Sequence, residues 1–320
     1  MGTFRQVGHK MPTSPDAEEP PEIPTELDQS FDLKALYKAT SVPGPGMRLT
    51  TDPPPRHMWA GPVAAGSHPG GPVGVMAGAL PVFTDGCQSA AVIDCVGSAR
   101  RPVLLLWAGA TSLEPVHRVV GALIERLWLV CSVEDEEEVR SLPGGAPVMT
   151  VPALIPSGIR SDALKQLREV RAHFERVVIR TTATDGLLMV DGSLLTLGSE
   201  PVSRTIGVSK SCRTRYLEDE RPLVQLPEGH TSRSFVLSRR SVLEADRVSA
   251  YLRLHPPAGD DWTHGLIRVE AYSEDDLAAG VAAAFATRQH PGSQDPRRDC
   301  QLIGTYIVEE MLKSRRPTFL

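Results

Sequence analysis

The sequence predicts a mixed α/β (α+β) fold, in which helices flank a mixed sheet that carries added β-strands. Three short apolar runs, Ala79–Thr84, Ser89–Val96 and Pro102–Ala108, are joined by connections too short for crossover helices, so they predict an antiparallel meander. A fourth run, Gly186–Val190, is apolar throughout, which is typical of a central strand. Segments with helical spacing of apolar residues follow these strands.

Four helices are predicted where apolar residues recur every three or four positions. They span Leu113–Val130, Ser161–Arg176, Asp275–Thr287 and Gln301–Lys313. The second opens with Ser161 and Asp162 as its cap. Further strands are predicted at Val202–Ser209, Ser234–Leu237, Ala250–Leu254 and Leu266–Ala271, the last two as a pair.

Residues 1–55 are expected to form a largely disordered or docking N-terminal segment, ahead of a single domain over 56–320. Pro12–Pro24 is rich in Pro and Glu, and Pro43–Pro55 is rich in Pro and Gly, so neither buries enough apolar surface to offset its ordering entropy. Between them, Phe31–Tyr37 has the spacing of a short amphipathic helix. This helix either packs on the body of the domain or docks a partner.

The composition is that of an ordinary globular protein, with 41% apolar and 23% charged residues. A net charge of -5 argues against a simple nucleic-acid coat protein, but not against an enzyme that meets DNA in one groove. The five cysteines form no CxxC pair, so no structural zinc site is expected. With no signal peptide and no apolar run long enough to span a bilayer, we expect a soluble cytoplasmic protein with reduced thiols.

Two apolar runs end in the same way, with an aspartate followed by a glycine. Asp85 and Gly86 follow the first, and Asp191 and Gly192 follow the second. An aspartate at a strand end projects into the crevice beside the sheet, and the glycine lets the backbone turn sharply beside a metal or phosphate. Two such acids on neighbouring strands could share Mg²⁺ or Mn²⁺ for attack on a phosphodiester. The alternative is that Asp-Gly is simply a common turn pair.

Several motifs, in their order and spacing, resemble the NurA family of nucleases. LLMVDGSLL (Leu187–Leu195), followed by IGVSKS (Ile206–Ser211), resembles the second aspartate motif of that family and the strand after it. FTDGCQSAAVIDCVG (Phe83–Gly97) is similar to the first Asp-Gly motif. YLRLHP and LIRVEAY resemble the paired late strands, and QDPRRDCQLIGTYIVEEMLK (Gln294–Lys313) resembles the closing segment. The resemblance covers roughly residues 75 to 313 and diverges at the C-terminal end.

Membership of this family would imply an RNase H-like nuclease domain over 56–320. It would also imply Mn²⁺- or Mg²⁺-dependent DNA cleavage, of the 5′-end resection, exonuclease and endonuclease type, in which a metal-bound water attacks phosphorus. The implied assembly is a homodimer with a HerA-type hexameric ATPase as partner, in DNA repair or anti-phage defence. The alternative is a catalytically inactive RNase H-like module that binds DNA or regulates an ATPase.

The resemblance also requires a glutamate on the helix before the second Asp-Gly and a further ligand near the C-terminus. Glu169 matches the Glu-x-Arg-Ala run of the family and is the expected ligand. Glu175, six residues on, lies on a different helix face, so only one of the two can point at the metal. Asp295 is the expected fourth ligand, with His290 as the alternative. This chain lacks the Tyr/His-bearing end that the family uses there.

Lys210 lies one strand beyond Asp191, where it could neutralise a phosphate or developing negative charge. The segment around it, residues 204–253, contains ten basic and six acidic residues, whereas the chain as a whole has a net negative charge. Such an excess is typical of a DNA-facing surface, although a solvated mixed-charge face would look the same. The best candidates for contacts with the DNA backbone are Arg233, Arg239 and Arg240.

Overall fold

The computed structural model describes residues 35–36, 39, 47–48, 58–59, 63–114, 118–182, 184–194, 202, 204–210, 214–237, 245–257, 261–289 and 301–317. All of them belong to the unit that spans Phe31–Leu320. None of the helices in this described part of the chain is both long enough and apolar enough to cross a membrane.

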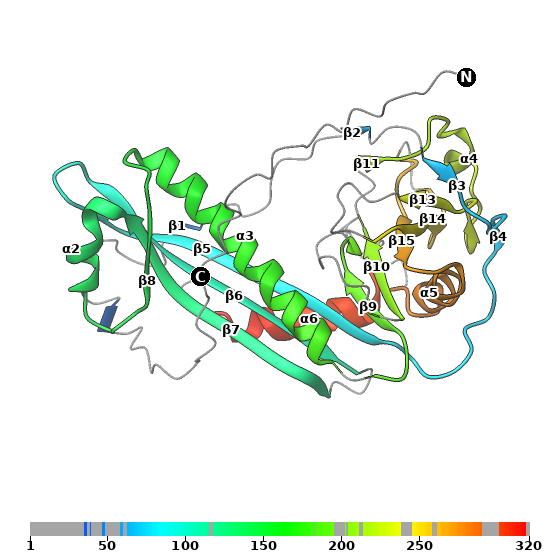
Figure 1. Cartoon of the computed structure of the whole chain (residues 1–320), viewed down its shortest axis with the longest axis horizontal. Helices are drawn as coiled ribbons and strands as arrows, with labels where there is room; N and C mark the ends of the chain where they lie inside the picture. The colour runs from blue at the N-terminus through cyan, green and yellow to red at the C-terminus, as the bar shows by residue number, and fades with distance from the viewer. Residues whose placement is uncertain are drawn as a thin grey trace, which may run out of the picture. The chain divides into compact units, whose positions relative to one another are not determined.

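The described strands form a 13-stranded mixed sheet, with helices on its faces (Figure 1). Its main path runs β3 (Ala64–Ala65), β13 (Phe235–Leu237), β14 (Arg247–Arg253), β15 (Leu266–Ala271), β10 (Thr205–Ser209), β9 (Leu188–Asp191), β5 (Val82–Val96), β6 (Arg101–Leu113), β7 (Val119–Ser132) and β8 (Val148–Val151). Beside this path lie β1 (Met47–Arg48), β4 (Gly71–Pro72) and β12 (His230–Thr231), while β2 (Met58–Trp59) and β11 (Thr214–Arg215) form a separate pair. The predicted fold class, a mixed sheet flanked by helices, is confirmed.

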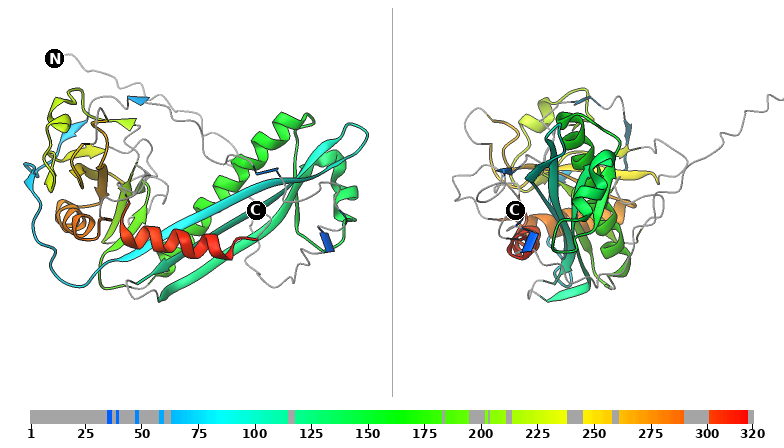
Figure 2. Two further views of the ribbon diagram at one scale, coloured as in Figure 1. Left: turned by 180° about the vertical axis from the view of Figure 1, so that it is seen from behind. Right: turned by 90° about the vertical axis from the view of Figure 1, so that its left-hand side faces the viewer.

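Helices lie on both faces of the sheet, as the two views in Figure 2 show. The long helix α3 (Pro156–Thr181) packs its Ile179 against Val82 and Leu188 on one face. The helices α5 (Glu274–Ala286) and α6 (Ile303–Arg315) cover the other face, over the main core. The remaining helices are short: η1 (Val133–Asp135), α2 (Glu136–Arg140) and α4 (Arg221–Val224).

The helix predicted over Leu113–Val130 is wrong, because this segment forms the strand β7. β7 pairs antiparallel with β6, and the central strand of the meander is therefore β6. One face of β7 meets α3 and the other meets the main core, so both sets of alternating side chains are mostly apolar, with Glu125 and Arg126 as the charged exceptions. A strand that is covered on both faces loses its two-residue period, and its apolar positions then also fit a helix.

The two strands predicted at Ala79–Thr84 and Ser89–Val96 are one continuous strand, β5. Its ladder with β6 runs without a break through Asp85↔Thr111 and Gly86↔Ala110. Gly86 therefore makes no turn, and its backbone stays extended within the ladder. The long β6 partner decides this, because each residue that it pairs adds ladder hydrogen bonds that a turn at Gly86 would lose.

Part of the N-terminal segment packs on the body of the domain. Leu36 is fully buried in the main core, and Met47–Arg48 pairs with β5 at Ala91 and Val92. The helix predicted over Phe31–Tyr37 is described only at Ala35 and Leu36, which are helical. Of the two alternatives for this helix, the burial of Leu36 favours packing on the domain.

Candidate functional site

The structure brings Asp85 and Asp191 side by side. β5 and β9 are parallel neighbours, with Thr84 and Val190 as register partners, so the next residue of each strand is one of the two aspartates. Adjacent strands lie about 4.8 Å apart, and residues in register point to the same face of the sheet. Both carboxylates therefore lie on the face that α6 covers.

Lys210 supplies the positive charge at this pair of acids. β10 is the next parallel strand, with Val208 opposite Asp191, and Lys210 follows two residues later on the same face. Its Nζ donates to Asp191 Oδ2 at 2.7 Å. Burial alone would lower the pKa of Lys210, but the charges of Asp191, Asp85 and Glu309 outweigh it and raise that pKa above its ordinary value.

Asp85 is the more buried of the two acids, with an exposed fraction of 4%. Burial raises the pKa of its carboxyl well above the ordinary value, and the charge of Asp191 adds to the rise while Lys210 opposes it. Glu175 and Glu309 raise this pKa further. Three other carboxylates and one ammonium thus act on the carboxyl of Asp85.

Glu175, on α3, lies against the opposite face of β5, directly over Gly86. A Cβ atom at Gly86 would lie 2.3 Å from Glu175 Oε1, so the glycine makes room for this carboxylate and does not serve a turn. Arg171 donates to Glu175 Oε1 at 2.8 Å. Burial nevertheless raises the pKa of Glu175 to about 7, against the opposing charge of Arg171.

Glu169, the glutamate expected from the resemblance, is 65% exposed and lies 4.0 Å from Lys165. The glutamate that the structure brings to the aspartates is Glu175. The spacing of apolar residues along the helix could have indicated Glu175, because this residue falls within the buried stripe that includes Phe174 and Val178. A carboxylate inside such a stripe is unusual enough to mark a functional position.

Acidic side chains on the two faces of the sheet come close to one another beside Asp85, because β5 has no described neighbouring strand on one edge there. β9 ends at Asp191, and no strand within the described ranges pairs with β5 between Asp85 and Ala90 on the edge opposite β6. Glu309, which sequence reasoning missed, comes from α6 and is held by Gln301 at 2.9 Å and Lys313 at 2.9 Å. Among the described residues, no three His, Cys, Asp or Glu side chains converge closely enough to hold a metal ion.

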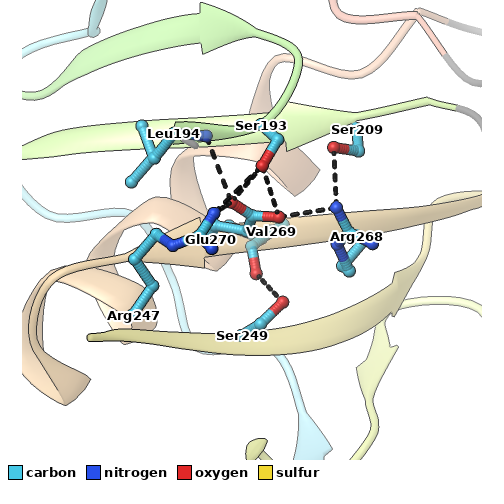
Figure 3. A network of polar contacts seen from close by, with 8 residues as sticks. All are labelled: Ser193, Leu194, Ser209, Arg247, Ser249, Arg268, Val269 and Glu270. Carbon is cyan, nitrogen blue, oxygen red and sulfur yellow. Dashed lines mark hydrogen bonds and ion pairs between the residues drawn. The ribbon is translucent and has the colours of Figure 1, made fainter. Parts of the chain in front are cut away.

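The turn after Asp191 is anchored to β15 by a buried polar network, which Figure 3 shows. Its centre is the fully buried carboxylate of Glu270. Ser193 Oγ donates to this carboxylate at 2.8 Å, and the backbone N–H of Leu194 donates at 3.1 Å. Gly192 has a φ of +109°, so here the glycine does serve a turn, as predicted for the second Asp-Gly.

The basic excess over residues 204–253 does not form one exposed surface. Arg247 and Arg253 are buried, with exposed fractions of 6% and 0%, and Arg221 is paired with Asp219 at 2.9 Å. Arg233 is exposed, and its role in DNA contact stays a prediction. The other predicted site residues, Arg239, Arg240, Asp295 and His290, lie outside the described residues.

Neither protein-family models nor curated proteins match the sequence of this chain. Among solved structures, the crystal structure of the NurA nuclease from Sulfolobus solfataricus is similar to it, at 10% sequence identity. The similarity covers 77% of this chain and 87% of that chain, with a TM-score of 0.42.

Proposed function

We propose that this chain is a divalent-metal-dependent DNA nuclease with an RNase H-like core, and that Asp85 and Asp191 form the heart of its site. The observation that carries the proposal is the pair itself: two carboxylates next to each other on parallel strands, where the sheet edge opens. The resemblance to NurA nucleases in motif order supports DNA as the substrate. It also supplies the homodimer and the HerA-type ATPase partner as parts of this proposal.

The electrostatics favour a functional site over a structural one. Burying like charges together is unfavourable, and a site built for stability alone would be served as well by apolar residues. Here burial and neighbouring acids raise the pKa of Asp85, and burial raises that of Glu175 to about 7. Strongly shifted pKa values at neighbouring acids are typical of functional sites. A cation would relieve this repulsion.

The residues fit Mg²⁺ or Mn²⁺ in donor chemistry, because carboxylate oxygens are the ligands that these hard ions prefer. Asp85 and Asp191 would hold the ion. When bound, such an ion neutralises phosphate charge and activates water. Lys210, which donates to Asp191, would then donate to a phosphate oxygen of the DNA backbone.

A covalent route through the thiol of Cys87 is disfavoured. Cys87 lies next to Gly86 on β5, two residues after Asp85. Burial and the charge of Asp85 raise the pKa of its thiol to about 11. The thiol is therefore protonated at neutral pH, and the thiolate is the nucleophilic form. Attack by water on phosphorus remains the chemistry that the site supports.

The test is the Asp191→Asn variant, which keeps the size of the side chain and removes its charge. We expect it to abolish Mn²⁺-dependent degradation of linear DNA, while the urea midpoint of unfolding stays close to that of the wild type. Glu169→Gln is the matched control, because it removes an exposed carboxylate from α3. Undiminished cleavage by Asp191→Asn would remove the metal-site assignment.

A second candidate function is a catalytically inactive module that binds DNA or regulates an ATPase. Two observations favour it. Lys210 forms an ion pair with Asp191, so this carboxylate already has a positive partner. In the described part of the chain, no three ligand side chains converge on a metal position. Calorimetric titration with Mn²⁺ separates the two functions. An inactive module should release no binding heat that depends on Asp85 and Asp191.

A further inference from the structure

Glu270 is a buried carboxylate that holds two arginines, one from its own strand and one from β14. Arg268 donates to its Oε1 at 2.6 Å, and Arg247 donates to its Oε2 at 3.1 Å (Figure 3). The exposed fractions are 0% for Glu270, 6% for Arg247 and 5% for Arg268. Each of the three ions has therefore lost nearly all of its contact with water.

Stability alone does not explain this cluster. The cost of taking several ions out of water often equals or exceeds their mutual attraction, so apolar residues would hold the two strands together as well. The contacts of Glu270 outside the ion cluster are more informative. Its carboxylate accepts from Ser193 Oγ and from the backbone N–H of Leu194. Both donors belong to the turn that directly follows Asp191.

The same cluster reaches the segment that carries Lys210. Arg268 donates to Ser209 Oγ at 3.3 Å, and Ser209 directly precedes Lys210. Figure 3 shows Ser193 beside the carboxylate of Glu270, and Ser209 beside the guanidinium of Arg268. One buried carboxylate and its arginine are therefore bonded to the chain next to both members of the Asp191–Lys210 pair.

Gly207 explains how the turn comes within reach. In the ladder between β10 and β15, Gly207 lies opposite Glu270. A Cβ atom there would lie 2.9 Å from the carbonyl oxygen of Gly192 and 2.9 Å from Leu194 Cγ. Without a side chain at Gly207, the turn lies directly on β10, and Ser193 extends over that strand to the carboxylate.

We infer that Glu270 is a positioning residue, which sets the place of Asp191 and Lys210 through Ser193, Leu194 and Ser209. It lies on the face of the sheet opposite the two aspartates, so it acts through the backbone and not on the substrate. The inference deepens the proposed function and rests on it for the metal. Residues that orient metal ligands typically change metal affinity by about 10- to 100-fold when they are replaced.

The test uses Ser193→Ala, because it removes the side-chain contact between the turn and Glu270 and leaves the Leu194 backbone contact and the buried ion cluster in place. Ser249→Ala is the matched control: Ser249 is a fully buried serine on β14 whose Oγ donates to the carbonyl oxygen of Val269 at 2.9 Å, away from the turn. Hydrogen exchange at the Leu194 amide and the affinity for Mn²⁺ are measured in the full-length protein. Glu270→Gln is measured alongside, with its urea midpoint as a check of folding.

We expect Ser193→Ala to speed exchange at the Leu194 amide roughly tenfold, because the turn then keeps only one of its two hydrogen bonds to Glu270, that of the Leu194 amide itself, and this remaining bond opens more often. We also expect it to weaken Mn²⁺ binding about tenfold or more. Ser249→Ala should change neither. Equal effects of the two variants, or no effect of Ser193→Ala on exchange, would overturn the inference. If the wild type binds no Mn²⁺ and Asp191→Asn cleaves normally, the proposed function fails, while the exchange comparison still decides the positioning role.

Discussion

Replacing Glu175 by Gln should change how the stability of the metal-free protein depends on pH. Glu175 is 4% exposed, and burial raises its pKa from 4.5 to about 7 in the folded state. Between these two values the folded protein holds a proton that the unfolded chain has released. The free energy of unfolding of the wild type therefore falls as the pH rises through this interval. Gln carries no such proton, so the variant lacks this loss.

The magnitude follows from the interval between the two pKa values. Each pKa unit corresponds to about 1.4 kcal/mol, so the wild type should lose about 2 to 3 kcal/mol relative to Glu175→Gln between pH 5 and pH 8. Asp85 also has a raised pKa, but burial and the charge of Asp191 are its main causes and both remain in the variant, so most of its pH dependence is common to the two proteins.

The assay is urea unfolding of both proteins in EDTA at several values of pH from 5 to 8. Glu169→Gln is the control on the same helix, and its exposed ion pair with Lys165 should be worth no more than about 0.5 kcal/mol at any of these values. A difference between wild type and Glu175→Gln that stays constant with pH would refute the reasoning, because it would mean that Glu175 does not hold its proton in the folded state.

Two further predictions concern the packing around the site and the architecture of the sheet. Gly86→Ala should lower the free energy of unfolding by about 1 to 3 kcal/mol, because its Cβ meets Glu175 Oε1 at 2.3 Å. A second Glu175→Ala change should relieve most of this penalty, and equal penalties in both backgrounds would contradict the assignment. Arg253→Met should cost about 3 kcal/mol or more, because this fully buried side chain donates to four backbone carbonyls, those of Leu223, Leu226, Trp262 and His264. Arg221→Met, at a side chain that is 87% exposed, is its control in thermal unfolding, and equal midpoints for the two variants would count against the role of Arg253.

The sequence by itself determined the elements whose period is local. The strand predicted at Leu266–Ala271 has the same bounds in the structure, and the helix predicted at Asp275–Thr287 is α5 to within one residue at each end. Both segments carry an undisturbed pattern between clear boundary residues. The strand that ends in Asp191 and its turn at Gly192 were also predictable, because a buried apolar run followed by Asp-Gly indicates them directly.

Only the tertiary structure decided what depends on partners far away in the chain. β7 is a strand because it is covered on both faces, and β5 continues through Asp85 because β6 pairs with it there. Glu175, and not Glu169, is buried against the sheet because it lies in the stripe of α3 that faces the sheet. Sequence spacing does not say which helix face meets which strand.

Glu309 and Glu270 carry no local signal at all. Glu309 lies on an ordinary amphipathic helix, and Glu270 alternates with apolar residues as any strand residue could. Both glutamates lie far from Asp191 in the sequence, and folding brings them to opposite faces of the sheet near the end of β9. The sequence shows that a residue carries a carboxylate. The distance of that carboxylate from other charges and from water is determined only when the sheet and helices assemble.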